Sequence, residues 1–503
     1  MILDQFEKRD DMQQEKLGTS LRDNLVTIRS MCGNSADVMI RELELHGQRI
    51  ALISCSAMIN DLNAYQLVVS PLTQLSEEET RTPEQIFDFI HTQSMLSMEL
   101  TDVFEFELVF VYIMSGFMVV LIDGIPEAVA LGLQGFKYRG VSEPSSDVNQ
   151  HGSQEAFTEV AVVNGSMLRR RMKTPSLRLE QLRIGKKSNT IVFVAYLSDR
   201  ADPQLVQDIK RRLSEVENDV ILAAAYLRPF LESGKKTIFS TVSTTERPDT
   251  LCAKIAEGRV AILVDGTPFA LVTPTLFIEN FQNLDDYCTK PYFATFIRIV
   301  KYLAFFITVF LPGVYIAFVN FTPEIIPSSL LYNITANQSI MPFSIMIEAI
   351  IINFIYEIMR EAGIRMPQSV GHAVSIVGSL VVGQAAVSAG LISAPMIMMV
   401  ALTAISSYVI PSIYEACSFL RLLFILLGGF FGLLGIAVGS IFVLVNITSL
   451  NSFGVPYLAT ISPFSLKAMR DVIYRASWTK LQKRAAKVQN LDGAHVIERD
   501  ADE

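Results

Sequence analysis

Two acidic side chains, Glu348 and Glu357, stand in an otherwise apolar segment and are the residues best suited to interact with ions. An ionisable group at membrane depth is costly and usually marks a water-filled path. Because the two residues are nine positions apart, they project from opposite sides of an ideal helix. Glu348 is the deeper candidate; we expect it to face an aqueous pathway in an oligomer, and a partner inside the helix bundle is the alternative. Glu357 lies beside Arg360 and could form an interfacial ion pair, and with Asn353 these two carboxylates are our candidate pore or gating residues.

A second set of charged residues ends a predicted helix. The segment from Phe157 to Met172 has helical character and finishes with Arg169, Arg170 and Arg171. Basic residues at a helix C-terminus commonly compensate the helix dipole while remaining solvated. The competing interpretation is that they contact a neighbouring subunit or anionic lipid headgroups.

The chain shows no residue set that predicts an enzyme, a metal site or a cofactor. Its cysteines and histidines are dispersed and lack the spacings of metal or redox sites; they are Cys32, Cys55, Cys252, Cys288, Cys417, His46, His91, His151, His372 and His495. Gly185-Lys-Lys-Ser188 resembles the end of a phosphate loop, but Glu180 occupies the position where that loop needs its first glycine. We expect neither catalysis, nor a bound metal, nor a nucleic-acid partner.

The elements that carry the acidic pair belong to a membrane domain. Only eight formally charged residues occur between Tyr302 and Asn446, and the stretch 366–413 has none. About 20 apolar helical residues span the hydrocarbon layer of a bilayer. Hydrophobic segments lie near 302–320, 342–358, 370–391, 395–413 and 419–447. Only the last third of the chain is therefore expected to lie in a membrane.

The charges of the connecting loops predict an orientation. With the soluble region inside, Arg360, Arg365 and Arg421 are cytoplasmic, as the positive-inside rule requires. The basic tail between 467 and 487 should lie on the same side, yet five simple spans would place it outside. One segment must then be unusual. Either the glycine-rich stretch 419–447 follows a broken or re-entrant path, or 342–358 does not cross the membrane.

The soluble region contains a repeat. Apolar runs flank Asp123-Gly124 and Asp265-Gly266, and an Asp-Gly pair between two such runs predicts a tight β-hairpin. Each hairpin follows an apolar strand and a helical stretch; in the second copy the helix covers 204–216. Two hairpins at equivalent places indicate two related α+β subdomains.

These features predict the domain organisation. We expect an N-terminal α+β subdomain over 1–140, a second over 155–290, a transmembrane helical domain over 295–465, and a basic and polar tail over 466–503. The N-terminus is acidic and lacks an apolar signal region, so the soluble part is expected in the cytoplasm. The predicted fold class is an α+β cytoplasmic domain of two related subdomains followed by an α-helical multi-pass membrane domain.

Several motifs closely resemble the GerA family of spore germination proteins, in particular its A subunit. They are Thr245-Glu-Arg-Pro-Asp249, the segment 257–270, Arg360-Glu-Ala-Gly-Ile-Arg-Met-Pro367, Ala373-Val-Ser-Ile-Val-Gly378, Gly383-Gln-Ala-Ala386 and Ser452-Phe-Gly-Val-Pro-Tyr457. The resemblance covers about 155–475, whereas the residues before about 150 are similar only in layout.

The resemblance implies a germinant receptor of the inner spore membrane. It implies two partners, a transporter-like B subunit that senses nutrients and a lipoprotein C subunit, and a homo-oligomer in the lipid membrane that acts as a nutrient-gated ion channel. Two alternatives stay open: a paralogous spore membrane channel that acts with the dipicolinate-release machinery, and a secondary nutrient transporter. The chain departs from the family pattern at Gly152-Ser-Gln-Glu-Ala-Phe157 and at Asn353, where an acid is common.

Overall fold

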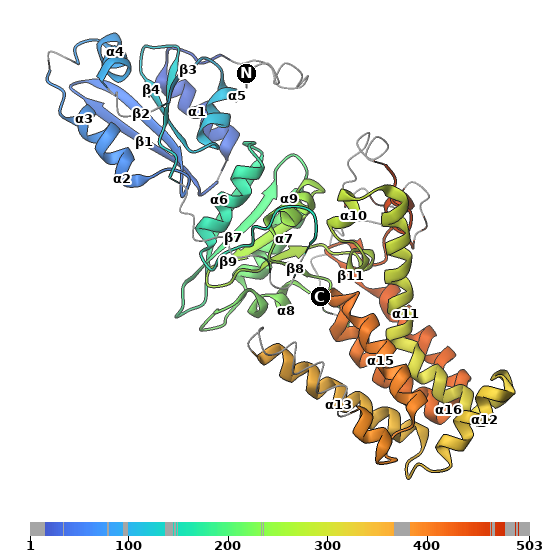
Figure 1. Cartoon of the computed structure of the whole chain (residues 1–503). Helices are drawn as coiled ribbons and strands as arrows, with labels where there is room; N and C mark the ends of the chain where they lie inside the picture. Colours follow the sequence, from blue (N-terminus) through green and yellow to red (C-terminus); the bar gives the residue numbers. More distant parts are fainter. Residues whose placement is uncertain are drawn as a thin grey trace.

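The computed structural model of the 503-residue chain consists of two α+β units and a helical bundle (Figure 1). The blue unit comes first in the chain, the green unit follows, and the bundle runs from yellow to red. The structure describes residues 16–33, 35–77, 80–93, 99–135, 144, 147, 149–232, 234, 236–366, 383–462, 464, 468–477, 488 and 491. Most of the predicted segment 370–391 lies outside these residues.

The first unit is a five-stranded antiparallel sheet with the strand order β1-β2-β4-β5-β3. Its strands are β1 (Val38–Leu45), β2 (Gln48–Cys55), β3 (Leu100–Val103), β4 (Phe117–Ile122) and β5 (Ala128–Gly132). Its helices are α1 (Leu21–Cys32), α2 (Asp61–Ala64), a π-helical turn (Tyr65–Val69), α3 (Ser70–Thr73), α4 (Pro83–Gln93) and α5 (Phe106–Ile113).

The second unit repeats this arrangement with the strand order β6-β7-β9-β10-β8. Its strands are β6 (Leu177–Ile184), β7 (Thr190–Leu197), β8 (Ser243–Thr245), β9 (Val260–Val264) and β10 (Ala270–Thr273). Its helices are α6 (Ala161–Arg171), α7 (Pro203–Ser214), α8 (Arg228–Leu231) and α9 (Pro248–Ala256), with short 3-10 turns at Ala224–Tyr226 and Phe277–Phe281. Both predicted hairpins are confirmed as β4-β5 and β9-β10.

The two Asp-Gly turns perform the same structural task in both units. The carboxylate of Asp123 accepts a hydrogen bond from the N–H of Leu21, the first residue of α1, at 2.9 Å. Asp265 accepts the equivalent bond from Ala161, the first residue of α6, also at 2.9 Å. A carboxylate at a helix N-terminus satisfies a free N–H group and complements the dipole. Each hairpin thus fixes the helix that begins its own unit.

Each sheet is buried on both faces. In β4, Val119 and Leu121 pack with residues of α1 and α5, whereas Met118 and Val120 pack with residues of α2, α3 and α4. Neighbouring residues of a strand point to opposite faces, which is why β4 reads as a continuous apolar run. The fold class predicted for this region, two related α+β units, is confirmed.

The helical region follows the short helix α10 (Asp285–Cys288). It contains α11 (Pro291–Phe321), α12 (Ser328–Gln338), α13 (Ile345–Arg365), α15 (Ala394–Tyr408) and α16 (Tyr414–Ser449), with 3-10 turns at Pro323–Ile325 and Pro411–Ile413. A short hairpin, β11 (Asn451–Ser452) and β12 (Val455–Pro456), and a 3-10 turn at Ala468–Asp471 come last. Among the described residues, two helices are long and apolar enough to cross a membrane, Pro291–Phe321 and Pro411–Ser449, and Ala394–Tyr408 is a shorter apolar helix.

Helix α16 is bent back on itself at Gly432. This residue has φ 61° and ψ −145°, a conformation that is open essentially to glycine alone. A Cβ atom on Gly435 would lie 2.6 Å from the carbonyl oxygen of Leu427, and one on Gly439 would lie 3.1 Å from Cε1 of Phe424. Residues that are 15 positions apart meet in this way only if the second half returns along the first. The predicted broken path for 419–447 is confirmed.

Both ends of α16 lie beside the second α+β unit. Ser412, just before the helix, donates a hydrogen bond to the carbonyl oxygen of Asn280 at 3.1 Å. Near its other end, Asn446 accepts one from the Thr237 hydroxyl at 2.9 Å. Each half has roughly 18 residues and is about 27 Å long, close to the hydrocarbon thickness of a bilayer. The bend at Gly432 therefore brings the chain back to the end of the bundle where α16 began.

Candidate functional site

The membrane-type bundle contains a polar cluster centred on Glu357. Its carboxylate accepts hydrogen bonds from the Tyr414 hydroxyl at 2.8 Å, the Ser418 hydroxyl at 2.5 Å and Arg421 Nη2 at 2.6 Å. These three donors are spaced by four and three residues, so they share one face of α16. The Arg421 side chain is 2% exposed and that of Glu357 is 32% exposed. Glu357 therefore joins α13 to the first half of α16 through a charge that is buried.

Aromatic rings and a third helix complete this cluster. The Arg360 guanidinium lies 3.6 Å from the centre of the Tyr414 ring, and its Nε lies 3.4 Å from Glu357. Arg421 lies 5.4 Å from the centre of the Tyr356 ring. The Tyr356 hydroxyl lies 3.3 Å from the hydroxyl of Ser407 in α15. A guanidinium over an aromatic face is stabilised by the quadrupole of the ring.

The sequence showed only part of this cluster. The Glu357–Arg360 ion pair was predicted and is present, but Arg421 was expected among the charges at a cytoplasmic membrane boundary. The structure instead buries Arg421 against Glu357, a partner 64 positions earlier in the chain. The helical spacing of Tyr414, Ser418 and Arg421 is the signal that could have indicated a shared partner.

Glu348 lies in the first turn of α13 and is fully buried. Its Oε2 accepts a hydrogen bond from the backbone N–H of Ser393 at 2.9 Å. Its Oε1 makes no hydrogen bond within the described part of the chain. Within the single chain Glu348 faces the interior of its own bundle, and its exposure to an aqueous pathway in an oligomer stays a prediction. The hydrogen bond to Oε2 therefore fits the alternative interpretation, in which Glu348 has a partner inside the helix bundle.

Asn353 belongs to the same buried face of α13 as Glu348. Its Nδ2 donates a hydrogen bond to the Ala349 carbonyl at 2.7 Å, and its Oδ1 makes none to the described residues. Buried polar atoms usually have a hydrogen-bond partner. Glu348 Oε1 and Asn353 Oδ1 are therefore sites where water or an ion would bind, or where a rearrangement of the bundle would supply a donor. The role of Glu348, Asn353 and Glu357 in a pore or gate stays a prediction.

Two glycines bring α11 and α16 into backbone contact. A Cβ atom on Gly313 would overlap the carbonyl oxygen of Phe424, and one on Gly428 would overlap the carbonyl oxygen of Gly313. Small residues of this kind allow helices in membranes to approach closely. The first half of α16 thus contacts α11 through Gly428 and Phe424, and α13 through the Glu357 cluster.

Arg169 connects the two α+β units. Its guanidinium pairs with Asp37, which precedes β1, with 2.6 Å between Nε and Oδ2, and it also donates to the Ser35 hydroxyl at 2.7 Å. Burial alone would raise the pKa of Asp37, but the adjacent Arg169 guanidinium outweighs burial and lowers it. The Arg169 side chain is 1% exposed. The prediction that it contacts a neighbouring subunit or a headgroup is therefore wrong.

Arg170 and Arg171 share one carboxylate. Both guanidinium groups pair with Glu155, in the segment that precedes α6, and the Arg171 contact is 2.5 Å. Burial would raise the pKa of Glu155, yet the two arginines together lower it. Each of the two side chains keeps about a quarter of its surface exposed. Their contact with a second subunit or with lipid stays a prediction.

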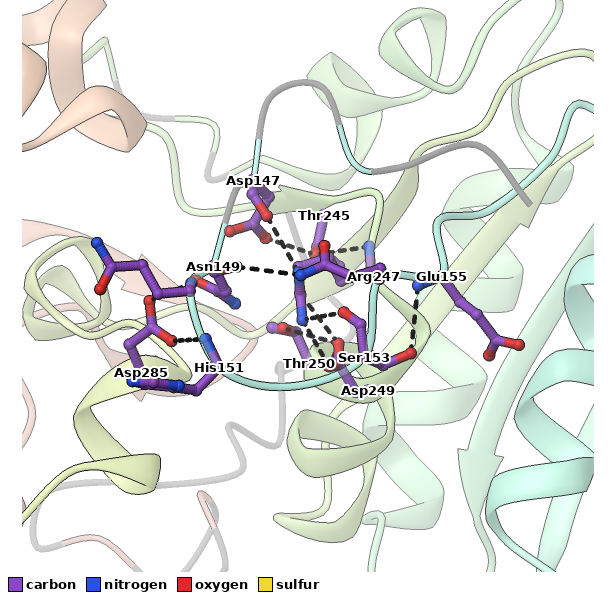
Figure 2. A network of polar contacts seen from close by, with 12 residues as sticks. Asp147, Asn149, His151, Ser153, Glu155, Thr245, Arg247, Asp249, Thr250 and Asp285 are labelled. Carbon is purple, nitrogen blue, oxygen red and sulfur yellow. Dashed lines mark hydrogen bonds and ion pairs between the residues drawn. The ribbon is translucent and has the colours of Figure 1, made fainter.

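The linker between the two units is held by a buried arginine (Figure 2). Arg247 is fully buried, and its Nη2 donates to the carbonyl oxygen of Ser153 at 2.8 Å and to Asp249 at 2.7 Å. Its Nη1 donates to the carbonyl oxygen of Asp147 at 3.3 Å. The motif 245–249 is thus a clamp on the linker, and we call Arg247 and Asp249 the Arg247 clamp.

The described residues contain no evident metal centre. No group of three or more His, Cys, Asp or Glu side chains in this part of the chain is arranged to hold an ion. The five cysteines are free, and burial raises the pKa of the Cys32 thiol to about 11 and that of Cys252 to about 12. A thiol with a raised pKa is a weak nucleophile at neutral pH.

Comparison with known proteins places the chain in a family. A profile described as Bacillus/Clostridium GerA spore germination protein matches residues 26–487. The chain belongs to the GerA family. The match includes most of the first α+β unit. The motifs in the sequence had shown only a similar layout for that unit. The expected family is confirmed, and the resemblance extends further towards the N-terminus than the motifs indicated.

Two relatives and one solved structure are similar to the chain. Spore germination protein KA of Bacillus subtilis (strain 168) is 37% identical over 491 residues, covering 95% of this chain and 90% of the relative. Uncharacterized membrane protein YfkQ of the same organism is 31% identical over 478 residues, covering 94% and 92%. The N-terminal domain of the A subunit of the Bacillus megaterium spore germinant receptor GerK3 is 29% identical, with 53% of this chain and 99% of that chain covered and a TM-score of 0.40.

Proposed function

We propose that this GerA protein is the A subunit of a spore germinant receptor and that its helical bundle conducts ions. The observation that carries the proposal is the polar interior of the bundle, where Glu348, Glu357 and Arg421 are held among apolar helices. Ionisable groups at such positions are expensive and usually serve ion or proton movement. Membership of the GerA family supplies the biological setting, which is spore germination.

The proposed receptor contains further subunits. A transporter-like B subunit senses the nutrient, a lipoprotein C subunit accompanies it, and several copies of this chain form the conducting oligomer. The assembly lies in the inner spore membrane with the α+β units in the cytoplasm. The Glu357–Arg421 contact between α13 and α16 holds the closed state, and a relative movement of these helices gives ions access to Glu348.

The proposal is tested by reconstructing the receptor. The chain is produced together with B and C subunits of GerA-type receptors in spores that lack their own receptors, and a rich nutrient broth is added. Release of monovalent cations within minutes is expected, and spores without this chain should release none. Spores that carry the complete assembly at normal levels and still release no ions in broth would contradict the proposal.

Replacement of Glu348 by Gln tests the role of the buried carboxylate. The amide oxygen of Gln can still accept the Ser393 hydrogen bond, so assembly should be unchanged. Gln removes the negative charge that attracts a cation, and a rise of about 1.4 kcal/mol in the barrier to ion passage slows ion release by about tenfold. Glu361→Gln, at an exposed position paired with Arg365, is the matched control and should release ions normally. Unchanged flux in an assembled Glu348→Gln receptor would remove Glu348 from the pathway.

A further inference from the structure

Two consecutive carboxylates in α10 bind different parts of the chain. Asp285 accepts hydrogen bonds from the backbone N–H groups of Gln150 and His151 in the linker, at 3.0 and 2.8 Å. Asp286 accepts hydrogen bonds from Arg298 Nε at 3.0 Å and Lys301 Nζ at 3.1 Å, both in α11. One short helix thus binds the linker between the α+β units with one residue and the first long helix of the bundle with the next.

The linker is enclosed where it meets α10. Gly152 has φ 124°, and a Cβ atom there would lie 3.0 Å from Cδ2 of Leu284 and 3.4 Å from Nη2 of Arg247. Leu284 immediately precedes α10. Figure 2 shows the linker passing between Asp285 and the Arg247 clamp. A displacement of residues 150–153 therefore has to move either the clamp or α10.

The contacts that α10 makes with α11 are also buried and charged. Arg298 is fully buried, and besides Asp286 it binds Asp471 of the C-terminal segment, with 2.9 Å between Nη1 and Oδ1. Lys301 is 5% exposed. Charge-assisted hydrogen bonds among buried groups are about twice as strong as neutral ones, so α10 and the first turns of α11 move as one body.

We propose that Asp285 and Asp286 are positioning residues that couple the linker of the α+β units to α11. A change in the angle between the two units pulls on the linker, Asp285 carries the displacement into α10, and Asp286 passes it to Arg298 and Lys301. Tightly packed elements of this kind transmit small shifts because they adopt discrete arrangements. Only the consequence for germination rests on the proposed function; the mechanical coupling does not.

Hydrogen–deuterium exchange of the purified full-length chain in lipid nanodiscs tests the coupling directly. Asp285→Asn removes the charge that binds the linker, and Asp286→Asn removes the charge that binds Arg298 and Lys301 of α11. Coupling between sites is reciprocal, so each variant should speed exchange by about tenfold at both 149–157 and 291–301. Asp208→Asn, which breaks an exposed ion pair with Arg211, is the control and should change neither segment.

The opposite pattern would overturn the proposal. If Asp285→Asn affects the linker alone and Asp286→Asn affects α11 alone, the two contacts are independent. Should either Asn variant fail to fold, Asp285→Glu and Lys301→Met perturb the same contacts more gently and are read in the same way. Local effects in those variants would likewise refute the coupling.

A spore experiment separates this proposal from the proposed function. In assembled receptors, Asp285→Asn and Asp286→Asn should each slow ion release after broth addition, and the double variant should be no slower than the worse single variant. Additive losses in the double variant would show two separate roles and contradict the coupling. If the unaltered receptor releases no ions, the proposed function fails, while reciprocal exchange effects would still establish the coupling.

Discussion

Glu357 and Arg421 connect α13 to α16 through one buried guanidinium, and this contact can be tested by charge removal. Glu357→Gln leaves the Arg421 charge buried without its partner. Breaking a buried pair costs about 3–5 kcal/mol, and the lower end, about 3 kcal/mol, applies because Glu357 is 32% exposed. We expect a clear fall in the thermal midpoint of the purified chain, measured by circular dichroism.

A double variant distinguishes charge from packing. Glu357→Gln combined with Arg421→Met removes both charges and should recover most of the lost stability, since neutral replacements of a buried pair are often tolerated. Glu361→Gln, from an exposed pair with Arg365, should leave the midpoint unchanged. A double variant as unstable as the single one would mean that packing, rather than charge, holds the two helices together.

The contact between Arg169 and Asp37 should make the join between the α+β units sensitive to acid. The pKa of Asp37 is lowered in the folded state, so the contact stabilises the protein fully above the unfolded pKa of about 4 and loses this effect as pH falls through the lower folded pKa. Asp37→Asn should therefore reduce the thermal midpoint at pH 7, and the difference from wild type should shrink below pH of about 4. A difference that is the same at pH 7 and pH 3 would show that ionisation of Asp37 is not involved.

At the scale of elements, the bend in α16 depends on one glycine. Gly432→Ala introduces a side chain at φ 61°, where it would also lie 2.9 Å from Cγ of Phe321. Such strained positions cost about 1–3 kcal/mol, so we expect a lower thermal midpoint and less folded protein in membranes. Gly363→Ala is the matched control, because that glycine is helical and has no neighbour within 4 Å. Equal behaviour of the two variants would show that the bend does not require glycine.

Local patterns made the elements predictable, whereas the contacts between distant elements were not. Asp123-Gly124 and Asp265-Gly266 lie within the turns that they form, so their hairpins followed from composition and spacing. The pairing of Asp37 with Arg169 joins residues 132 positions apart, and no local pattern records which carboxylate an arginine will meet. The pairing of Glu357 with Arg421 was not predictable for the same reason. Burial of three apparently surface-type arginines, Arg169, Arg247 and Arg421, is a property of the tertiary structure.

For the whole molecule, the junction at the base of α11 brings three separate parts of the chain together. Helix α10 contributes Asp286, the bundle contributes Arg298, and the C-terminal segment contributes Asp471. The hydroxyl of Tyr287 also donates to Asp471 at 2.7 Å. The C-terminal segment therefore rests on the same end of the bundle as the α+β units. From this arrangement we predict an even number of crossings between α10 and the C-terminal segment.

We predict that the α+β units and the C-terminal segment lie on the same side of the membrane, and thiol labelling measures this orientation. The native Cys288 is exposed at the end of the bundle that carries the α+β units. Ser462→Cys places a thiol in the C-terminal segment and Ser339→Cys places one after α12, beyond the far end of α11; both serines are exposed. The two engineered thiols are introduced separately into a Cys288→Ser background. In sealed membrane vesicles a membrane-impermeant maleimide should label Cys288 and Ser462→Cys from the same side, and Ser339→Cys from the opposite side. Labelling of Ser462→Cys and Ser339→Cys from the same side would instead require an odd number of crossings and would contradict this orientation.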